Sequence, residues 1–340
     1  MNVLLTGGAG YIGSHIAVEL QEQGYGVVIA DNFSNSSPEV IARIEEITGK
    51  RPILCEIDMT DKASVDAAFR TNKPDAVIHL AGLKAVGESV DHPLMYYRNN
   101  LDSALTVLEA MRAHGVGKLI FSSSATVYGL QSSLPYTEDM PHGQSTNPYG
   151  STKQIIERII FDACADRKMN AVILRYFNPV GAHRSGLIGE SPRGIPNNLM
   201  PYIMQVATGK LPSLNVYGDD YPTRDGTGIR DYIHVTDLAK GHIRALSYNP
   251  ENSGVEVFNL GTGRGYSVLE IITAFEKVNR VKIPFTIAPR RAGDLAENYA
   301  DASKAERLLS WKAELSLEDM CGDSYRYSLN LNDGGGPETR

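Results

Sequence analysis

The sequence predicts an α/β fold in which a Rossmann-type, doubly wound parallel sheet is combined with a smaller C-terminal α/β domain. Short apolar runs recur along the first half of the chain, separated by helix-length segments, at residues 3–5, 27–30, 76–80, 119–121 and 171–174. Continuous apolar strands that alternate with helices are typical of a parallel sheet covered on both faces. After Phe177 the chain is punctuated by glycine and proline as far as Leu199, which indicates a change of domain.

The first apolar run leads directly into a glycine-rich loop at residues 6–13. Gly8, Gly10 and Gly13 satisfy the pattern G-x-G-x-x-G, and apolar residues at helical spacing follow. Such glycines allow a tight turn and bring the backbone close to a pyrophosphate at the helix N-terminus. The second run ends in Asp31, about 20 residues further on, where a carboxylate binds a ribose 2′-hydroxyl and repels a 2′-phosphate. Strand, glycines, helix and acid together predict a domain that binds NAD rather than NADP.

Later segments complete the predicted elements. A helix is predicted from about Pro93 to His114, where an apolar stripe at spacings of three and four indicates core packing: Leu94, Tyr97, Leu101, Leu105, Leu108 and Met111. Another helix is predicted over residues 149–165, and the apolar run at 255–260 is expected to return to the sheet. The predicted domains are residues 1–177 with about 234–262 for NAD, residues 178–233 and 263–332 for a substrate, and a flexible tail at 333–340.

Tyr149 and Lys153 form a Tyr-x-x-x-Lys pair, whose spacing puts both side chains on one face of the predicted helix. A free phenol titrates near 10, so a tyrosine acting as base at neutral pH needs a pKa lowered by about 3 units, worth roughly 4 kcal/mol. A neighbouring ammonium and a cationic nicotinamide ring both lower that pKa. Ser124 and Thr126, in the loop predicted after the strand at 119–121, are placed to hydrogen-bond a substrate hydroxyl. These residues predict acid–base chemistry on an alcohol beside NAD.

The composition narrows the remaining classes of function. The 340 residues carry a net charge of -7 without a basic run, so no nucleic-acid surface is predicted. Cys55, Cys164 and Cys321 are far apart and lack metal-ligand spacing, so we expect reduced thiols, a cytoplasmic location and no metal site. Apolar stretches stay well short of the ~18 residues that span a membrane, so membrane association is not expected.

Motifs across nearly the whole chain resemble those of the extended short-chain dehydrogenase/reductases. The matching segments are the glycine-rich start, Asp31-Asn32, Asp58, residues 81–84, residues 122–129, the Tyr149 and Lys153 pair, and Arg175-Tyr176-Phe177-Asn178. More narrowly, the runs at 83–89, 196–202, 226–235 and 291–294 are similar to those of the UDP-glucose 4-epimerase family. That resemblance implies interconversion of UDP-galactose and UDP-glucose in galactose metabolism, through a 4-keto sugar and transient reduction of tightly bound NAD.

The resemblance also implies roles for single residues. Tyr149 would take the proton of the C4 hydroxyl and Lys153 would stabilise the phenolate, while Ser124 and Thr126 would hold that hydroxyl. The residues implied in binding NAD are Gly7, Gly10, Tyr11, Ile12, Gly13, Asp31, Asn32, Phe33, Ser34, Asn35, Ser36, Asp58, Met59, Leu80, Ala81, Gly82, Lys84, Asn99, Ser122, Tyr149, Lys153, Tyr176 and Phe177. The residues implied in binding the UDP-sugar are Lys84, Ser124, Ala125, Thr126, Tyr149, Phe177, Asn178, Asn198, Leu199, Asn215, Val216, Tyr217, Arg230, Tyr232, Arg291, Asp294 and Asn298.

A homodimer is also implied, in which residues 93–114 and 149–165 of each subunit pack into a four-helix interface. Two other activities stay open at this point. A UDP-uronate 4-epimerase would share the loop at 122–129, and a non-catalytic NAD-sensing regulator would share the fold. The regulator, however, should have lost Tyr149, Lys153 or Ser124, and all three are present.

Selectivity for the sugar is expected to depend on one position before the Ala-Asp-Ala-Ser-Lys-Ala run. Family members that exclude N-acetylated sugars tend to carry a tyrosine there, whereas this chain has Asn298, with Tyr299 one place later. We therefore expect room for UDP-N-acetylhexosamines, unless Tyr299 occupies the same space.

Overall fold

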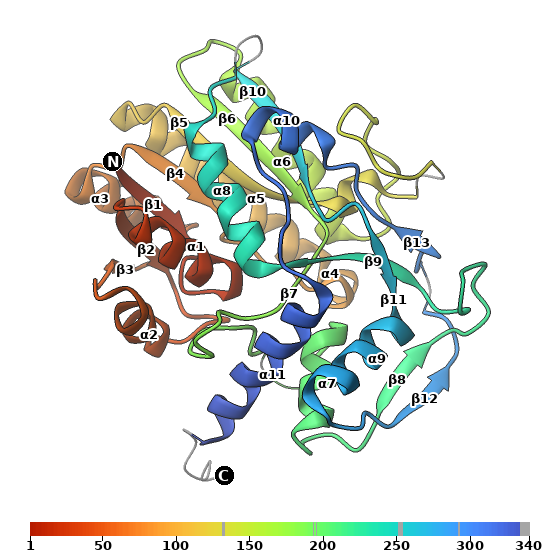
Figure 1. The fold of residues 1–340 in the computed structure, drawn as a ribbon. Coiled ribbons are helices and arrows are strands. Elements are labelled where there is room, and N and C mark those ends of the chain that lie inside the picture. Colours follow the sequence, from red (N-terminus) through yellow and green to blue (C-terminus); the bar gives the residue numbers. More distant parts are fainter. Residues whose placement is uncertain (131–132, 193, 195, 251–253, 292, 334–340) are drawn as a thin grey trace.

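Seven parallel strands form the central sheet of the computed structural model, which describes all residues except 131–132, 193, 195, 251–253, 292 and 334–340 (Figure 1). Across the sheet they are β10 (Val255–Leu260), β6 (Asn170–Tyr176), β5 (Lys118–Ser124), β4 (Ala76–His79), β1 (Asn2–Thr6), β2 (Gly26–Asp31) and β3 (Ile53–Glu56). The predicted doubly wound parallel sheet is confirmed, and the late strand at 255–260 pairs with β6. The strand order reverses at β1, which lies between β4 and β2. Ligands of such sheets bind at the carboxyl ends of the strands beside this reversal.

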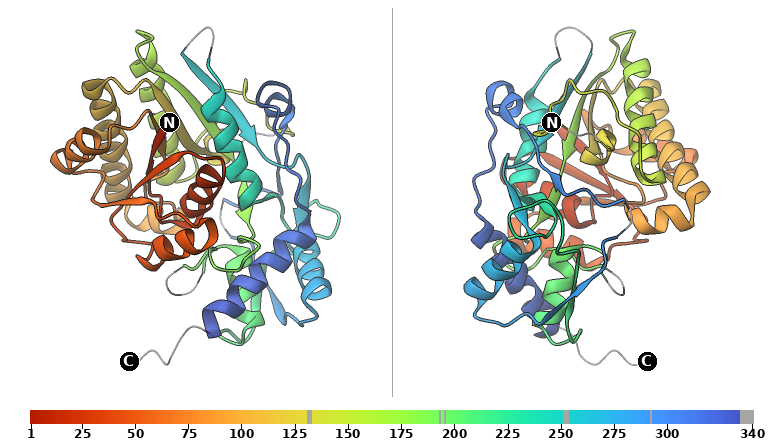
Figure 2. Two further views of the ribbon diagram at one scale, coloured as in Figure 1. Left: turned by 60° about the vertical axis from the view of Figure 1, so that its left-hand side comes forward. Right: turned by 90° about the vertical axis from the view of Figure 1, so that its right-hand side faces the viewer.

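Helices cover both faces of this sheet (Figure 2). One face packs against α1 (Tyr11–Glu22), α2 (Glu39–Thr48), α8 (Val235–Ser247) and α10 (Ser303–Leu309). The other packs against α3 (Lys62–Asn72), α5 (Pro93–His114) and α6 (Pro148–Cys164), and the short helix α4 (Val86–Asp91) contacts α5 and α6. The alternation of side chains explains the two cores: Val3 and Leu5 of β1 belong to one cluster, and Leu4 to the other.

A second group of elements, interrupted in the chain by α8 and β10, encloses its own core. One small sheet contains β7 (Asn178–Val180), β9 (Ile229–His234), β11 (Gly265–Ser267) and β13 (Glu297–Asn298), and another pairs β8 (Leu214–Tyr217) with β12 (Phe285–Ala288). They pack with α7 (Leu199–Ala207), α9 (Val268–Asn279) and α11 (Leu317–Asp333). The domain boundaries stay a prediction, and residues 334–340 of the predicted tail lie outside the described residues.

Three details of the predicted elements are wrong. The stripe on α5 does not face the core along its whole length, because Leu94 is 82% exposed and Leu105 is 39% exposed. Ser122 to Ser124 extend β5 instead of starting a loop, and the 3₁₀ helix η1 (Ala125–Tyr128) follows them. Likewise β6 continues past the apolar run at 171–174 through Arg175 and Tyr176, which were expected in the loop after it. In the part of the chain that the structure describes, no helix combines the length and the apolar character needed to cross a bilayer.

Candidate active site

The glycine-rich loop forms a tight connection between β1 and α1. Gly7 has a left-handed backbone (φ 67°), and the Gly10 amide donates to its carbonyl at 3.1 Å. A Cβ at Gly13 would strike Gly7 O and lie 2.7 Å from Gly8 Cα, so only glycine fits this crossing. Gly10 offers no side-chain cap and no acidic residue lies in the first turn of α1. The backbone N–H groups there suit a pyrophosphate.

Tyr11 and Ile12 are the first two residues of α1. The Tyr11 hydroxyl donates to the Gly181 carbonyl at 2.7 Å, which ties the loop to the segment after β7. Ile12 packs against the core on the α1 side of the sheet.

Asp31 connects the glycine loop with the segment that follows β2. One carboxylate oxygen accepts from the Ala9 amide at 3.0 Å, and the other accepts from the Phe33 amide and the Ser36 hydroxyl at 2.9 and 2.8 Å. Asn32 donates to Asp58 at 3.1 Å, which joins the loops after β2 and β3. The predicted adenosine-binding residues of both loops therefore lie together. Three other residues of these loops were predicted to bind NAD: Ser34 and Asn35 are exposed, and Met59 is buried in the core.

Tyr149, Lys153 and Ser124 lie together where β5 ends against α6. Asn147 caps α6 by accepting from the Gly150 amide, and Tyr149 and Lys153 follow within its first two turns, both largely buried. Lys153 Nζ lies 5.8 Å from the centre of the Tyr149 ring and donates to the Ser122 carbonyl at 2.8 Å. The predicted juxtaposition of phenol and ammonium is present, and the strand end holds the lysine in place.

The electrostatics of the chain's own residues differ from the predicted activation of Tyr149. Burial raises the pKa of Tyr149, and a hydrogen bond from Ser124 lowers it only in part. Burial lowers the pKa of Lys153 to about 8, and the charge of Glu157 raises it. A further positive charge beside the phenol is needed before Tyr149 can act as base at neutral pH.

Thr126 presents an unused hydroxyl to the same place. Its Oγ1 is buried and has no hydrogen-bond partner among the described residues. Thr126 lies against Gly150 in the first turn of α6, since a Cβ at Gly150 would be 3.4 Å from Thr126 Cβ. A buried hydroxyl normally finds a partner, so this one suits a ligand hydroxyl. Ala125 and Phe177 pack together in a small neighbouring core.

The segment after β4 is held by Asn100, a residue that the sequence analysis missed. The Asn100 amide accepts from the Leu83 amide at 2.8 Å and donates to the Leu83 carbonyl and Thr152 Oγ1, both at 3.1 Å. Thr6 holds the start of the segment by accepting from the Ala81 amide. Leu80 and Ala81 are half-buried and Gly82 is exposed, while the predicted Asn99 lies half-buried beside Asn100 on α5. Asn100 could have been identified from the sequence because it is a polar residue within the apolar pattern of α5.

Two predicted arginines meet at Asp294. Its carboxylate accepts from Arg291 Nε at 2.9 Å and lies 3.7 Å from Arg230 Nη2. The Arg291 guanidinium also stacks 5.0 Å from the centre of the Tyr217 ring. Two guanidinium groups beside an exposed aromatic ring suit a nucleoside diphosphate. Asn215 shares the exposed face of β8 with Tyr217, whereas the side chains of Val216 and Tyr232 are buried and can offer only backbone or support.

Glu190, which the sequence analysis did not single out, links two predicted binding segments. Lys84 Nζ donates to its carboxylate at 2.9 Å, and Asn198, the residue before α7, donates to the same oxygen at 3.4 Å. The Glu190 side chain is 10% exposed and that of Lys84 is 50% exposed. Lys84 and Asn198 are thereby brought together. Leu199 packs against the core of the small sheets, and Asn178 is exposed at the start of β7.

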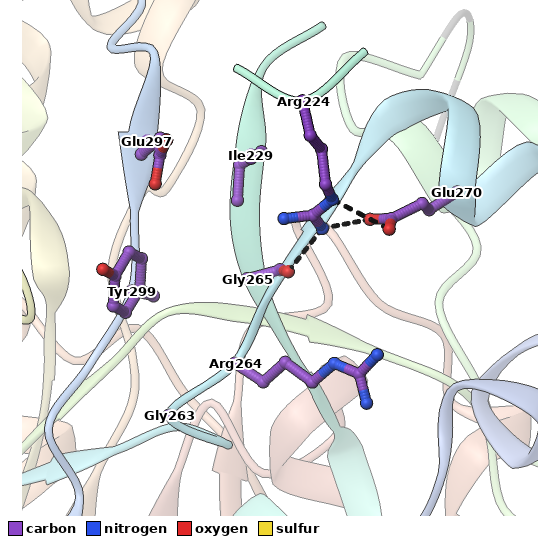
Figure 3. Close-up of a pocket in the computed structure, with 8 residues that line it drawn as sticks. All are labelled: Arg224, Ile229, Gly263, Arg264, Gly265, Glu270, Glu297 and Tyr299. Atoms are coloured by element: carbon purple, nitrogen blue, oxygen red, sulfur yellow. Dashed lines mark hydrogen bonds and ion pairs between the residues drawn. The ribbon is translucent and has the colours of Figure 1, made fainter.

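Asn298 ends the two-residue strand β13, and Tyr299 follows directly after it. Glu297 and Tyr299 line a cavity of about 490 Å³ with Arg224, Arg264 and neighbours from β9 and β11 (Figure 3). Successive side chains of a strand alternate, so Asn298 faces away from this cavity. Asn298 pairs with Arg230 of β9, and its Oδ1 is buried without a hydrogen-bond partner among the described residues. Tyr299 therefore does not occupy the space on the Asn298 side.

Comparisons with known proteins agree with this geometry. Residues 3–261 match the model of the NAD dependent epimerase/dehydratase family. The UDP-glucose 4-epimerase of Bacillus subtilis (strain 168) is 56% identical over 334 residues, which cover 98% of both chains. The UDP-glucose 4-epimerase of Homo sapiens is 54% identical over 343 residues, which cover 99% of both chains.

Solved structures are equally similar. The UDP-glucose 4-epimerase of Bifidobacterium longum, in complex with NAD+ and UDP, superposes with a TM-score of 0.94 at 54% identity, covering 98% of this chain and 100% of that one. The enzyme of Stenotrophomonas maltophila, with bound NAD and formylated UDP-arabinopyranose, gives a TM-score of 0.96 at 50% identity with the same coverage. The resemblance inferred from the motifs is confirmed, and the chain belongs to the NAD dependent epimerase/dehydratase family.

Proposed function

We propose that this protein is an NAD-dependent UDP-glucose 4-epimerase that interconverts UDP-galactose and UDP-glucose in galactose metabolism. One observation supports the proposal most directly. Four groups lie together at the end of β5: the side chains of Tyr149, Lys153 and Ser124, and the Thr126 hydroxyl, which has no partner among the described residues. This arrangement occurs in a chain more than half identical to 4-epimerases over nearly its full length. The uronate epimerase and the non-catalytic sensor are not favoured by these relatives.

The residues of the chain fit NAD. The glycine cradle accepts no Cβ at Gly13, and the start of α1 leaves its N–H groups for a pyrophosphate. Asp31 lies beside the cradle, where a carboxylate binds an adenosine ribose. Bound NAD would supply the hydride chemistry at C4 of the sugar, first as acceptor and then as donor to the opposite face.

The remaining chemistry belongs to the chain. Tyr149 accepts the proton of the C4 hydroxyl and later returns it, and Ser124 and Thr126 hold that hydroxyl. Lys153 stabilises the phenolate through its charge. Arg230 and Arg291 anchor the diphosphate, so that the hexose can turn about its link to the nucleotide while the nucleotide stays bound.

A first experiment tests chemistry and cofactor retention together. The purified protein is incubated with UDP-galactose without added NAD, and the nucleotide sugars are separated by chromatography. We expect UDP-glucose to accumulate towards an equilibrium mixture. Product that forms only after NAD is added would contradict tight retention, and no product under either condition would contradict the epimerase activity.

We also propose that UDP-N-acetylhexosamines are substrates. Asn298 leaves more space than tyrosine, and Tyr299, which follows β13, lines the cavity of Figure 3. In Asn298→Tyr, the rate on UDP-N-acetylglucosamine relative to UDP-galactose is expected to fall by at least about tenfold, as a clash of 1.4 kcal/mol or more would cause. Tyr299→Phe is the matched control and should keep the ratio. A wild-type protein inactive on the N-acetyl sugar but active on UDP-galactose would contradict the proposal.

A homodimer in the cytoplasm is the third part of the proposal. The outer faces of α5 and α6 expose five large apolar side chains that a second copy would cover: Leu94, Met95, Leu105, Ile155 and Phe161. The three cysteines are free, as expected in a reducing compartment. Sedimentation of Phe161→Glu should give a monomer, whereas Leu329→Glu, on the exposed side of α11, should sediment like the unchanged protein. A dimer that persists in Phe161→Glu would contradict this interface.

A further inference from the structure

A buried ion pair lies directly beneath the candidate catalytic pair. Glu157 is wholly buried on α6 and accepts two hydrogen bonds from Arg175 of β6, from Nη2 at 2.6 Å and from Nε at 3.1 Å. Ser123 of β5 donates to the same carboxylate at 2.5 Å, and His142 Nε2 lies 2.8 Å from it. The carboxylate is thus fully satisfied by three segments of the chain.

Stability alone does not explain this arrangement. A buried ion pair is often no more stabilising than apolar residues of the same volume, because both ions lose their hydration. Arg175 is only 4% exposed, so the pair is desolvated on both sides. An isolated charge in the core would be costly, and the geometry here provides it with partners instead. We therefore expect the Glu157–Arg175 pair to have a role in the neighbouring candidate active site.

The position of Glu157 relative to Lys153 suggests that role. The two residues are four apart on α6, so they lie on one face of the helix, one turn from each other. The end of β5 holds both: the Ser122 carbonyl accepts from Lys153, and the Ser123 hydroxyl donates to Glu157. Movement of Glu157 would shift the helix turn that carries Lys153.

The charged and titratable groups around Lys153 also indicate that Glu157 acts on it. Tyr149 is on its own helix, His79 faces it from β4, and His242 of α8 lies behind Ser122 through a 3.0 Å contact. Tyr176 of β6 interacts with Tyr149, and Arg175 of the same strand binds Glu157, with His142 and the Glu138 carbonyl beside its guanidinium. Burial lowers the pKa of the Lys153 ammonium, and Glu157 is the negative charge that raises it.

We propose that Glu157 is a positioning residue, whose buried carboxylate keeps Lys153 protonated and in register beneath Tyr149. This proposal rests on the proposed function, because Lys153 needs its charge to stabilise the Tyr149 phenolate. Arg175 acts one step further away, by keeping Glu157 ionised in the core: burial raises the carboxyl pKa, and the bonds from His142 and Arg175 bring it down to about 2.

The test is the pH profile of the epimerisation rate in Glu157→Gln, which keeps the shape of the side chain and removes its charge. Loss of an opposite charge shifts a pKa by about one unit or more, so the basic limb of the profile should move at least about one pH unit towards acid. At a pH above the basic limbs of both proteins, the rate of Glu157→Gln should then be about tenfold lower than that of the unchanged protein.

Two control variants accompany this test. Glu157→Asp keeps the charge and should return the basic limb to its wild-type position. His142→Gln, which removes one hydrogen-bond partner and leaves the carboxylate, is the matched control. An unmoved basic limb in Glu157→Gln would overturn the proposal, even if the rate fell equally at all pH values.

Two further measurements keep the test decisive. If Glu157→Gln leaves Arg175 unpaired and does not fold, Glu157→Gln with Arg175→Gln removes both buried charges, and its basic limb should still move towards acid. A limb at the wild-type position in that double variant would again overturn the proposal. The second measurement needs no activity: in the NAD-loaded protein, where a second positive charge lies beside the phenol, the ultraviolet titration of Tyr149, taken as the difference from Tyr149→Phe, should shift to higher pH in Glu157→Gln. It should not shift further when Glu157→Gln is added to Lys153→Met. An inactive wild-type protein with this coupling intact would refute the epimerase activity alone, whereas activity without the coupling would refute only the role of Glu157.

Discussion

Replacement of Gly13 by alanine tests the glycine cradle, on which the NAD assignment depends most directly. A Cβ at this position would strike Gly7 O and would lie 2.7 Å from Gly8 Cα and 2.9 Å from Gly8 C. All three atoms belong to the backbone, so the loop must move to accept the methyl group, and overpacking of this kind costs about 1–3 kcal/mol. Since each 1.4 kcal/mol is a factor of ten, we expect the affinity for NAD to fall by about 10- to 100-fold.

The assay combines a titration of NAD-free protein with NAD and an unfolding curve in urea. Gly322→Ala is the matched control, because its Cβ would meet only Val278 Cγ1, at an ordinary 3.5 Å, inside α11. Alanine there should stabilise the helix by up to about 1 kcal/mol and leave NAD binding unchanged. Wild-type affinity for NAD in Gly13→Ala, with an unchanged unfolding midpoint, would refute the reasoning.

Two further predictions concern the catalytic base and the stability in acid. Tyr149→Phe should lower kcat by about 10²- to 10⁴-fold while calorimetry finds UDP binding intact, and a normal kcat would contradict its role as base. Burial lowers the pKa of His15 and His79 to about 3 and that of His242 to about 4, from 6.5. Because the unfolded chain takes up these protons first, the stability that their neutral forms provide above about pH 6.5 is lost as the pH falls. At pH 5 the loss should be about 2 kcal/mol for each histidine, and urea unfolding of His15→Gln should show a smaller drop between pH 7 and pH 5 than the unchanged protein.

The features that sequence predicted well are those specified by neighbours along the chain. The glycine loop, the start of α6 at Pro148 and the full length of α5 depend on local turns, caps and spacing. The predicted apolar stripe on α5 was wrong in part, because what covers a face of a helix depends on residues that are distant along the chain. Periodicity gives a face of the helix but does not say whether the sheet, solvent or another subunit covers it, and Leu94 projects away from the core that holds Met111.

The supporting residues of the site could not be predicted because they meet only in the folded chain. Glu157 and Arg175 are 18 residues apart, and Lys84 and Glu190 are 106 residues apart. Neither pair has a spacing that sequence periodicity can detect. Arg175 lay within a recognised motif, but its partner depends on β6 lying beside α6. The residues with chemical roles carried motif signals, whereas those that hold them in place did not.

Tyr149 illustrates how a cofactor would contribute to the acid–base chemistry of the site. Its pKa is raised by burial, and the Ser124 hydrogen bond offsets only part of that rise. Lys153 contributes from beside the ring and is itself held by Ser122. The phenol therefore keeps its proton at neutral pH unless a further positive charge lies beside it. Because an oxidised nicotinamide is cationic and a reduced one is neutral, the pKa of Tyr149 should be lower before hydride transfer than after it. Tyr149 is therefore ionised and able to take the proton of the C4 hydroxyl while the positive charge is present, keeps that proton while the charge is absent, and releases it as the charge returns. A single tyrosine can serve both halves of an inversion for this reason, provided that Lys153 stays charged throughout.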